Sequence, residues 1–227
     1  MSAILKEEKK IESEVESVID RGRVVSFSDG VFAFAATLLV LKIDLPQINT
    51  NFSIESQLGT ALIALWPAYL ANIISFLIIG YYWLNHHAIF GFVHRYDQTI
   101  VWLNLVFLIF VSFTPFPVDL YGSYPKVPLI VVFYSASLAL VGYFLAFIWW
   151  YAADKHRLVS QKLSEAQIRY YLARILVAPI VFTCSIPLVY LHPVLAQLSW
   201  LLVIVGTLII NKKFHIKKLS KIEVDTF

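Results

Sequence analysis

Long apolar runs separated by short polar connections occupy almost the whole chain. Each run reaches or nearly reaches the roughly 20 residues that a helix needs to cross the bilayer core. Six such runs lie at about 24–45, 58–90, 99–120, 127–153, 169–191 and 194–210. Because hydrocarbon offers the backbone no hydrogen-bond partners, each run is predicted to be a helix. The second and fourth runs are long, so we expect them to tilt or to project from the membrane.

Three segments follow from this pattern. Residues 23–213 are predicted to form one all-α unit of six transmembrane helices. Residues 1–22 place apolar side chains at helical spacing among Lys and Glu, which predicts an amphipathic segment. This segment is either a solvated helix leading into the first span or a contact surface for the membrane or another copy. Residues 214–227 form a basic tail.

The composition supports an integral membrane protein. Apolar residues make up 59% of the 227, charged residues only 15%, and the mean hydropathy is +0.73. A soluble fold with this composition would not have enough polar residues to cover its surface. These values exclude secreted, disordered and nucleic-acid-binding proteins, and no room remains for a soluble catalytic domain. The single Cys184 excludes both a disulfide framework and a cysteine-based metal site within one chain.

The basic residues indicate the orientation in the membrane. Most of the 18 Lys and Arg residues lie in the N-terminus, the second and fourth connections and the C-terminus. Only Lys42 and Lys126 fall in connections on the opposite side. By the positive-inside rule both termini are predicted to be cytoplasmic, which agrees with an even number of spans. The net charge of +3 therefore reports topology rather than an anionic partner.

A polar cluster opens the first span, at Arg23, Ser28 and Asp29. An ionised Asp inside a span costs several kcal/mol unless it is paired. Arg23 precedes Asp29 by six residues and so does not share its helix face, which predicts that Asp29 finds a partner on another span. Small residues that follow at three-residue spacing would permit close helix contact: Gly30, Ala33 and Ala36. On these residues alone, a tightly packed structural helix with a paired charge remains an equal interpretation.

The second span ends in a second polar cluster, Trp83, His86 and His87. In the predicted topology it lies at the same depth as the first cluster, so hydrogen bonds between the two spans are expected, with His86 or His87 as a structural partner. A His that titrates near neutral pH and tunes gating is an alternative. Haem or metal ligation would require His on two facing spans, whereas the other histidines lie in connections or ends. We therefore expect neither cofactor nor metal.

Arg23, then Phe27-Ser28-Asp29, and then Thr37-Leu-Leu-Val-Leu41 resemble the signature of the transmembrane protein 175 family. This family comprises endolysosomal potassium channels of animals and their bacterial and archaeal relatives, and the six spans extend the resemblance over nearly the whole chain. In single-unit members four copies surround a central pore lined by the first span. The resemblance thus implies a prokaryotic homotetramer in the cell membrane, with potassium as the permeant ion.

One face of the first span is the candidate pore lining. Its members follow one another at three- and four-residue spacing: Phe27, Gly30, Phe34, Thr37, Leu41 and Asp44. The resemblance implies an apolar constriction at Phe34, a hydroxyl layer at Thr37 and a second apolar layer at Leu41. Phe34 departs from the family, where an aliphatic residue is more frequent. Asp44 is expected at the outer mouth, where it either attracts cations or is merely a solvated helix end.

The predicted function is passive conduction of K⁺, and also of Na⁺, by a protein that is not an enzyme. The carbonyl filter sequence TVGYG is absent, which predicts modest selectivity, and no span carries the regular Arg or Lys residues of a voltage sensor. A proton-coupled cation transporter is the alternative. It needs a titratable group at the membrane midplane, but Asp29, Asp44 and Asp119 all lie near span ends. A membrane enzyme or redox carrier would need a nucleophile–base pair or cofactor ligands, and a colourless purified protein would exclude the haem version.

Overall fold

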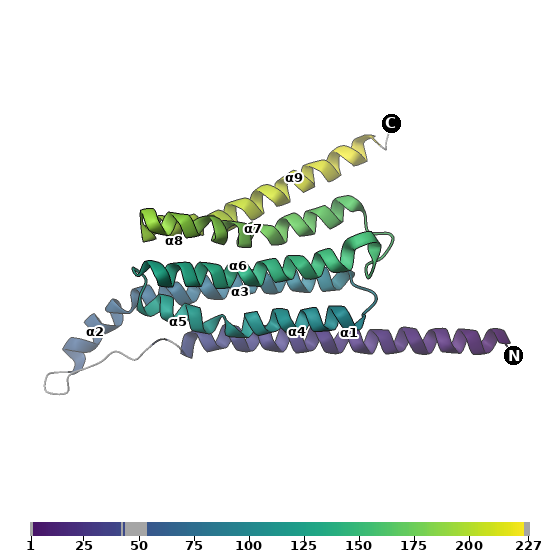
Figure 1. Cartoon of the computed structure of the whole chain (residues 1–227), viewed down its shortest axis with the longest axis horizontal. Helices are drawn as coiled ribbons and strands as arrows, with labels where there is room; N and C mark the ends of the chain where they lie inside the picture. The colour runs from purple at the N-terminus through teal and green to yellow at the C-terminus, as the bar shows by residue number, and fades with distance from the viewer. Residues whose placement is uncertain (1, 42, 44–53, 225–227) are drawn as a thin grey trace.

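The computed structural model describes the backbone of residues 2–41, 43 and 54–224, and the side chains of residues 22–41, 43, 54, 57–66 and 68–214. Within this part the chain is all-α, and its helices lie side by side in a bundle with both termini at the same end (Figure 1). The elements are α1 (Ser2–Leu41), α2 (Ile54–Ala64), α3 (Trp66–Phe92), α4 (Gln98–Phe113), α5 (Pro115–Ser123), α6 (Pro128–Ala153), the 3₁₀ helix η1 (Asp154–His156), α7 (Glu165–Leu191), α8 (Pro193–Ser199) and α9 (Leu202–Val224).

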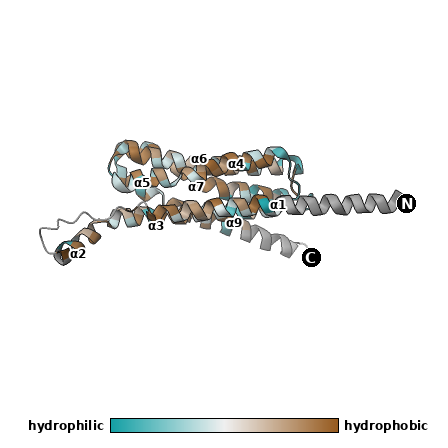
Figure 2. Cartoon of the chain, turned by 90° about the horizontal axis from the view of Figure 1, so that it is seen from below, coloured by the Kyte–Doolittle hydropathy of each residue, from teal (hydrophilic) through white to brown (hydrophobic). Residues whose placement is uncertain are grey.

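Six helical stretches are long and apolar enough to cross a bilayer, which confirms the predicted multi-pass membrane fold. They are Gly22–Leu41, Ala68–Phe92, Gln98–Ser123, Pro128–His156, Glu165–Leu191 and Pro193–Phe214. Hydrophobic colours dominate the helices, and hydrophilic colours gather toward the two ends of the bundle (Figure 2). An even number of spans accounts for the two termini at one end.

Several spans differ in detail from the expected runs. The second run, expected to be continuous over 58–90, is divided between α2 and α3 at Leu65, because Pro67 in the first turn of α3 carries no backbone N–H. The third span is broken at Thr114, directly before Pro115, and the sixth is broken between α8 and α9. The first span ends at Leu41. Asp44, the side chains of the amphipathic segment 1–21 and those of residues 215–227 lie outside the described residues.

Helices α6 and α7 pack closely around a glycine. A Cβ atom added to Gly142 of α6 would lie 2.7 Å from Cδ of Pro179 on α7, closer than carbon atoms can approach. Both residues are buried, and Pro179 lies inside α7, which stays continuous through it. Glycine at position 142 therefore lets the two helices meet along their backbones.

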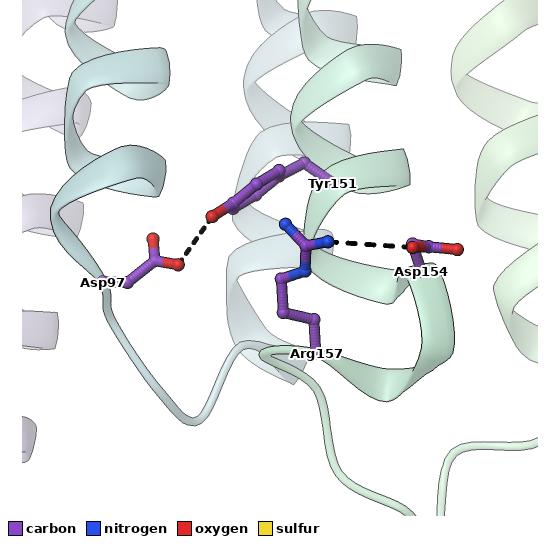
Figure 3. Close-up of polar contacts among 4 residues, drawn as sticks. All are labelled: Asp97, Tyr151, Asp154 and Arg157. Carbon is purple, nitrogen blue, oxygen red and sulfur yellow. Dashed lines mark hydrogen bonds and ion pairs between the residues drawn. The ribbon is translucent and has the colours of Figure 1, made fainter.

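At the end that holds both termini, a small polar cluster joins α4 to α6 (Figure 3). Asp97 caps α4 by accepting the Ile100 backbone N–H at 2.8 Å, and its other oxygen accepts the Tyr151 hydroxyl at 2.7 Å. The Arg157 guanidinium lies 4.6 Å from the centre of the Tyr151 ring and 3.9 Å from the Asp154 carboxylate. The cluster fixes the start of α4 against the end of α6.

Gly142→Ala should destabilise the protein by about 1–3 kcal/mol, because α6 and α7 must move apart to admit the methyl group. The melting temperature of the purified protein in detergent measures the effect. Gly91→Ala is the matched control, since a Cβ atom at Gly91 would meet nothing within 4 Å. Equal melting temperatures for the two variants would contradict the close contact.

Candidate pore-lining helix and its polar network

The membrane-spanning part of α1 has two distinct faces. One face is buried against the other helices, with exposed fractions of 0–3%, and consists of Ser28, Phe32, Ala35 and Leu39. The opposite face carries the residues predicted to line a pore. There Phe27 is 57% exposed, Phe34 64% and Leu41 75%, with Gly30 and Thr37 exposed between them. The structure therefore brings the predicted set, apart from Asp44, onto one outward stripe of α1.

Thr37 is the hydroxyl-bearing member of this stripe. Its Oγ1 donates a hydrogen bond of 2.9 Å to the Phe34 carbonyl, one turn earlier in the same helix. Because the hydroxyl proton points back to the backbone, the lone pairs of the oxygen remain available to a group outside the helix that binds oxygen lone pairs. A monovalent cation is such a group, because it is coordinated by oxygen lone pairs.

A buried chain of hydrogen bonds ties α1 to α3 and α4. Asn104 of α4 donates from Nδ2 to Ser28 Oγ at 2.9 Å, and Ser28 donates onward to the Val24 carbonyl at 2.8 Å. Nε2 of His86 on α3 lies 2.9 Å from Asn104 Oδ1. Because the amide nitrogen is used toward Ser28, the amide oxygen must accept, so Nε2 of His86 carries the proton. Ser28, His86 and Asn104 are at most 1% exposed.

Aromatic rings hold His86 in this position. The imidazole stacks on Phe90 with the ring centres 4.2 Å apart, and the rings of Phe107 and Phe32 lie at 5.5 and 5.6 Å. Its Nδ1 atom is buried and has no hydrogen-bond partner among the described residues. In contrast, His87 is exposed and lies beside Trp83, with the ring centres 5.8 Å apart. The buried network thus contains only one of the two neighbouring histidines.

Asp29 has a hydrogen-bond partner on α3, as expected for an acidic residue inside a span. Trp83 donates from Nε1 to Asp29 Oδ1 at 2.8 Å. Arg23 is exposed and forms no ion pair with Asp29 within the described part of the chain. The pair lies at the edge of a groove of about 660 Å³ between α1 and α3, which is lined almost entirely by apolar atoms and includes Ala33, Ala36 and Gly80. Ala33 and Ala36, two of the three small residues expected to permit close helix contact, thus line this groove.

Asn104 is the one member of the network that the sequence analysis did not identify. It lies in the run 99–120, where its only signal is that it is an amide among apolar side chains. A polar residue inside a span usually has a hydrogen-bond partner there. The sequence therefore indicated that Asn104 has a partner but not which residue it is. No cluster of His, Cys, Asp and Glu suited to a metal ion occurs among the described residues.

Known proteins of similar sequence and structure include bacterial channels. A potassium channel of Streptomyces collinus is 36% identical over 154 residues, which cover 66% of this chain and 73% of that protein. The crystal structure of a lysosomal potassium-selective channel TMEM175 homologue from Chamaesiphon minutus superposes with a TM-score of 0.71. It is 31% identical, and the match covers 85% of this chain and 98% of that one. The chain belongs to the TMEM175 family.

The family model, endosomal/lysosomal potassium channel TMEM175, matches residues 23–115. The match begins at Arg23 and includes every member of the network between α1, α3 and α4. The endosomal/lysosomal proton channel TMEM175 of Homo sapiens is 28% identical over 148 residues, which cover 65% of this chain and 29% of that protein. The resemblance noted in the sequence is therefore confirmed, and TMEM175 proteins are ion channels, which is not a class of enzymes.

Asn104→Leu should destabilise the bundle by about 1–3 kcal/mol, because it leaves the buried His86 Nε2–H without its acceptor. Thermal unfolding in detergent measures the loss. Asn72→Leu is the matched control, since the Asn72 amide donates only to the Ala68 carbonyl in its own helix. If Asn104→Leu has the same melting temperature as the wild type, the network does not contribute to stability.

Proposed function

We propose that the protein is a potassium-permeable cation channel in which four copies surround a pore lined by the outward face of α1. The observation that carries the proposal is the two-sided character of this helix. Its inner face bonds to Asn104 of α4, which in turn bonds to His86 of α3, while Phe27, Phe34 and Leu41 are exposed on the other face. Membership of the TMEM175 family, with a potassium channel among its close relatives, supports the same conclusion.

The constriction would be apolar. Four Phe34 rings at one level around an axis exclude water unless the pore widens, so that the pore conducts when wet and blocks when dewetted. The ring faces also attract cations, which favours K⁺ and Na⁺ over anions. Thr37 lies about 4.5 Å further along the helix and Leu41 about 6 Å beyond it. An ion that passes Phe34 therefore meets a ring of hydroxyl oxygens before a second apolar layer.

Conduction would be passive and only moderately selective. The proposed ion contacts are flexible side chains rather than a rigid ring of carbonyl groups, so K⁺ and Na⁺ differ modestly in their fit. Asp29, the acidic residue of the described part of α1's span, is engaged by Trp83 on the side facing α3. It is thus not presented to the proposed pore as a carboxylate that could couple ion movement to a proton.

The termini are proposed to be cytoplasmic. The connection from α3 to α4 and the connection from α6 to α7 lie at the end of the bundle that holds both termini (Figure 1). These connections contain Arg95, Lys155, Arg157 and Lys162, whereas Lys126 lies in the connection from α5 to α6 at the opposite end. The basic end faces the cytoplasm under the positive-inside rule.

Ion flux into liposomes reconstituted with the purified protein tests the function. A potassium gradient should drive flux without any coupling ion, and a sodium gradient should drive less. An ionophore added to empty vesicles and to protein-containing vesicles separates leak from channel activity. Flux that requires an opposing proton gradient would replace the channel with a proton-coupled transporter.

Phe34→Ala should raise cation flux several-fold, because removing four rings widens the constriction and lets it hydrate. Phe147→Ala serves as the control, since it removes a ring of the same size, also exposed, from α6. The measurement is the initial rate of potassium uptake per reconstituted tetramer. Unchanged flux in a well-folded Phe34→Ala tetramer would exclude Phe34 from the pore.

Thr37→Val keeps the shape of the side chain and removes its oxygen. We expect a lower potassium conductance and a K⁺/Na⁺ permeability ratio closer to one, since the passing ion loses a ligand. Thr183→Val on α7, where the hydroxyl bonds to Tyr143, is the control. Reversal potentials under mixed ionic conditions provide the ratio, and an unaltered ratio and conductance would place Thr37 away from the ion path.

A further inference from the structure

Arg174 is a cation inside the fifth span, and no acidic partner for it lies in the part of the chain that the structure describes. It lies nine residues after the start of α7, and its side chain is half-buried. Its Nε atom is buried, and among the residues with described side chains it finds no hydrogen-bond partner and no carboxylate that forms an ion pair with Arg174. A charged side chain at this depth is costly unless an anion or water reaches it.

Three helices meet at Arg174. On α7, Tyr170, Arg174 and Val177 form one stripe at four- and three-residue spacing. Tyr170 donates its hydroxyl to Asn211 Oδ1 of α9 at 2.8 Å, and a Cβ atom at Gly206 would lie 2.8 Å from Cγ1 of Val177. Arg174 therefore lies between two contacts of α7 with α9. From the third helix, α3, the Tyr81 hydroxyl donates to the Arg174 carbonyl.

The position of Arg174 directs its side chain toward the membrane surface. Side chains on a helix lean toward its N-terminus, and the N-terminus of α7 lies at the end of the bundle that holds both chain termini (Figure 1). Arg174 lies one turn, about 6 Å, deeper than the contact between Tyr170 and Asn211. The next residues of α9, Lys212 and Lys213, are exposed at that surface. An Arg side chain is long enough to bridge this depth.

We propose that an anionic phospholipid binds between α7 and α9 through its headgroup phosphate, which Arg174 holds together with Lys212 or Lys213. A guanidinium matches the geometry of a phosphate, to which it can donate two parallel hydrogen bonds. Basic recesses between transmembrane helices at the cytoplasmic side favour anionic headgroups. The phosphate supplies the counter-charge that the described part of the protein does not provide to Arg174.

The test is thermal unfolding of the purified full chain in detergent, titrated with dioleoyl-phosphatidylglycerol. A lipid that binds the folded state raises the melting temperature in a concentration-dependent manner. We expect phosphatidylglycerol to do so for the wild type, and phosphatidylcholine to have a much smaller effect. Arg174→Gln should lose the response. Arg169→Gln, which removes an exposed charge near the start of α7, should retain it.

A second variant tests the proposal in case Arg174→Gln does not fold. The double variant Lys212→Gln/Lys213→Gln alters two exposed side chains, and it should weaken the apparent affinity for phosphatidylglycerol about fivefold or more. An affinity equal to that of the wild type would overturn the proposal, as would a full response in folded Arg174→Gln. Equal responses to phosphatidylcholine, or to glycerol 1-phosphate at the same concentration, would also overturn it, because the site would then not select an anionic lipid.

Discussion

The hydrogen bonds that pass from His86 through Asn104 to Ser28 determine which way α1 faces. Neighbouring residues on a helix differ in direction by about 100°, so a rotation of α1 by one residue would take Ser28 out of reach of Asn104. Hydrocarbon offers these three polar groups no other partners, and a rotated helix would leave them unsatisfied. The orientation of Phe34, Thr37 and Leu41 on the opposite face is thus a consequence of polar contacts that none of these residues makes.

The remainder of the bundle gives this network a fixed support. Gly142 allows α6 and α7 to pack along their backbones, and Asp97 and Tyr151 hold the start of α4 against the end of α6. Since α4 carries Asn104, these contacts also position the network. Apolar helices in lipid gain little from the hydrophobic effect when they associate, so close packing and a few polar contacts have to define their arrangement.

The sequence was sufficient to predict the six spans, because lipid allows an apolar run of that length no structure other than a helix. It also predicted the outward stripe of α1, which depends only on helical spacing, and hydrogen bonds between the first span and the polar cluster that ends the second. It expected His86 or His87 as the partner, whereas the Asp29 carboxylate bonds to Trp83. It did not choose between His86 and His87. These neighbours point about 100° apart, and only contact with α4 shows that His86 is the buried one. Asn104 was not identified for the same reason, and the breaks at Leu65 and Thr114 were not placed because Pro can either kink or end a helix.

The contacts of α1 are unevenly distributed along its length. Every hydrogen bond shown between its described side chains and other helices involves Ser28 or Asp29, near the end of the bundle that holds both termini. Further along, Ala35 and Leu39 make apolar contacts, which resist sliding less than hydrogen bonds do. If such a helix tilts, its pivot is expected near Ser28, where the hydrogen bonds hold it. With 1.5 Å of rise per residue, a tilt of about 10° displaces Phe34 by about 1.6 Å and Leu41 by about 3.4 Å. In the proposed pore, the same small motion would therefore change the diameter at Leu41 roughly twice as much as at Phe34.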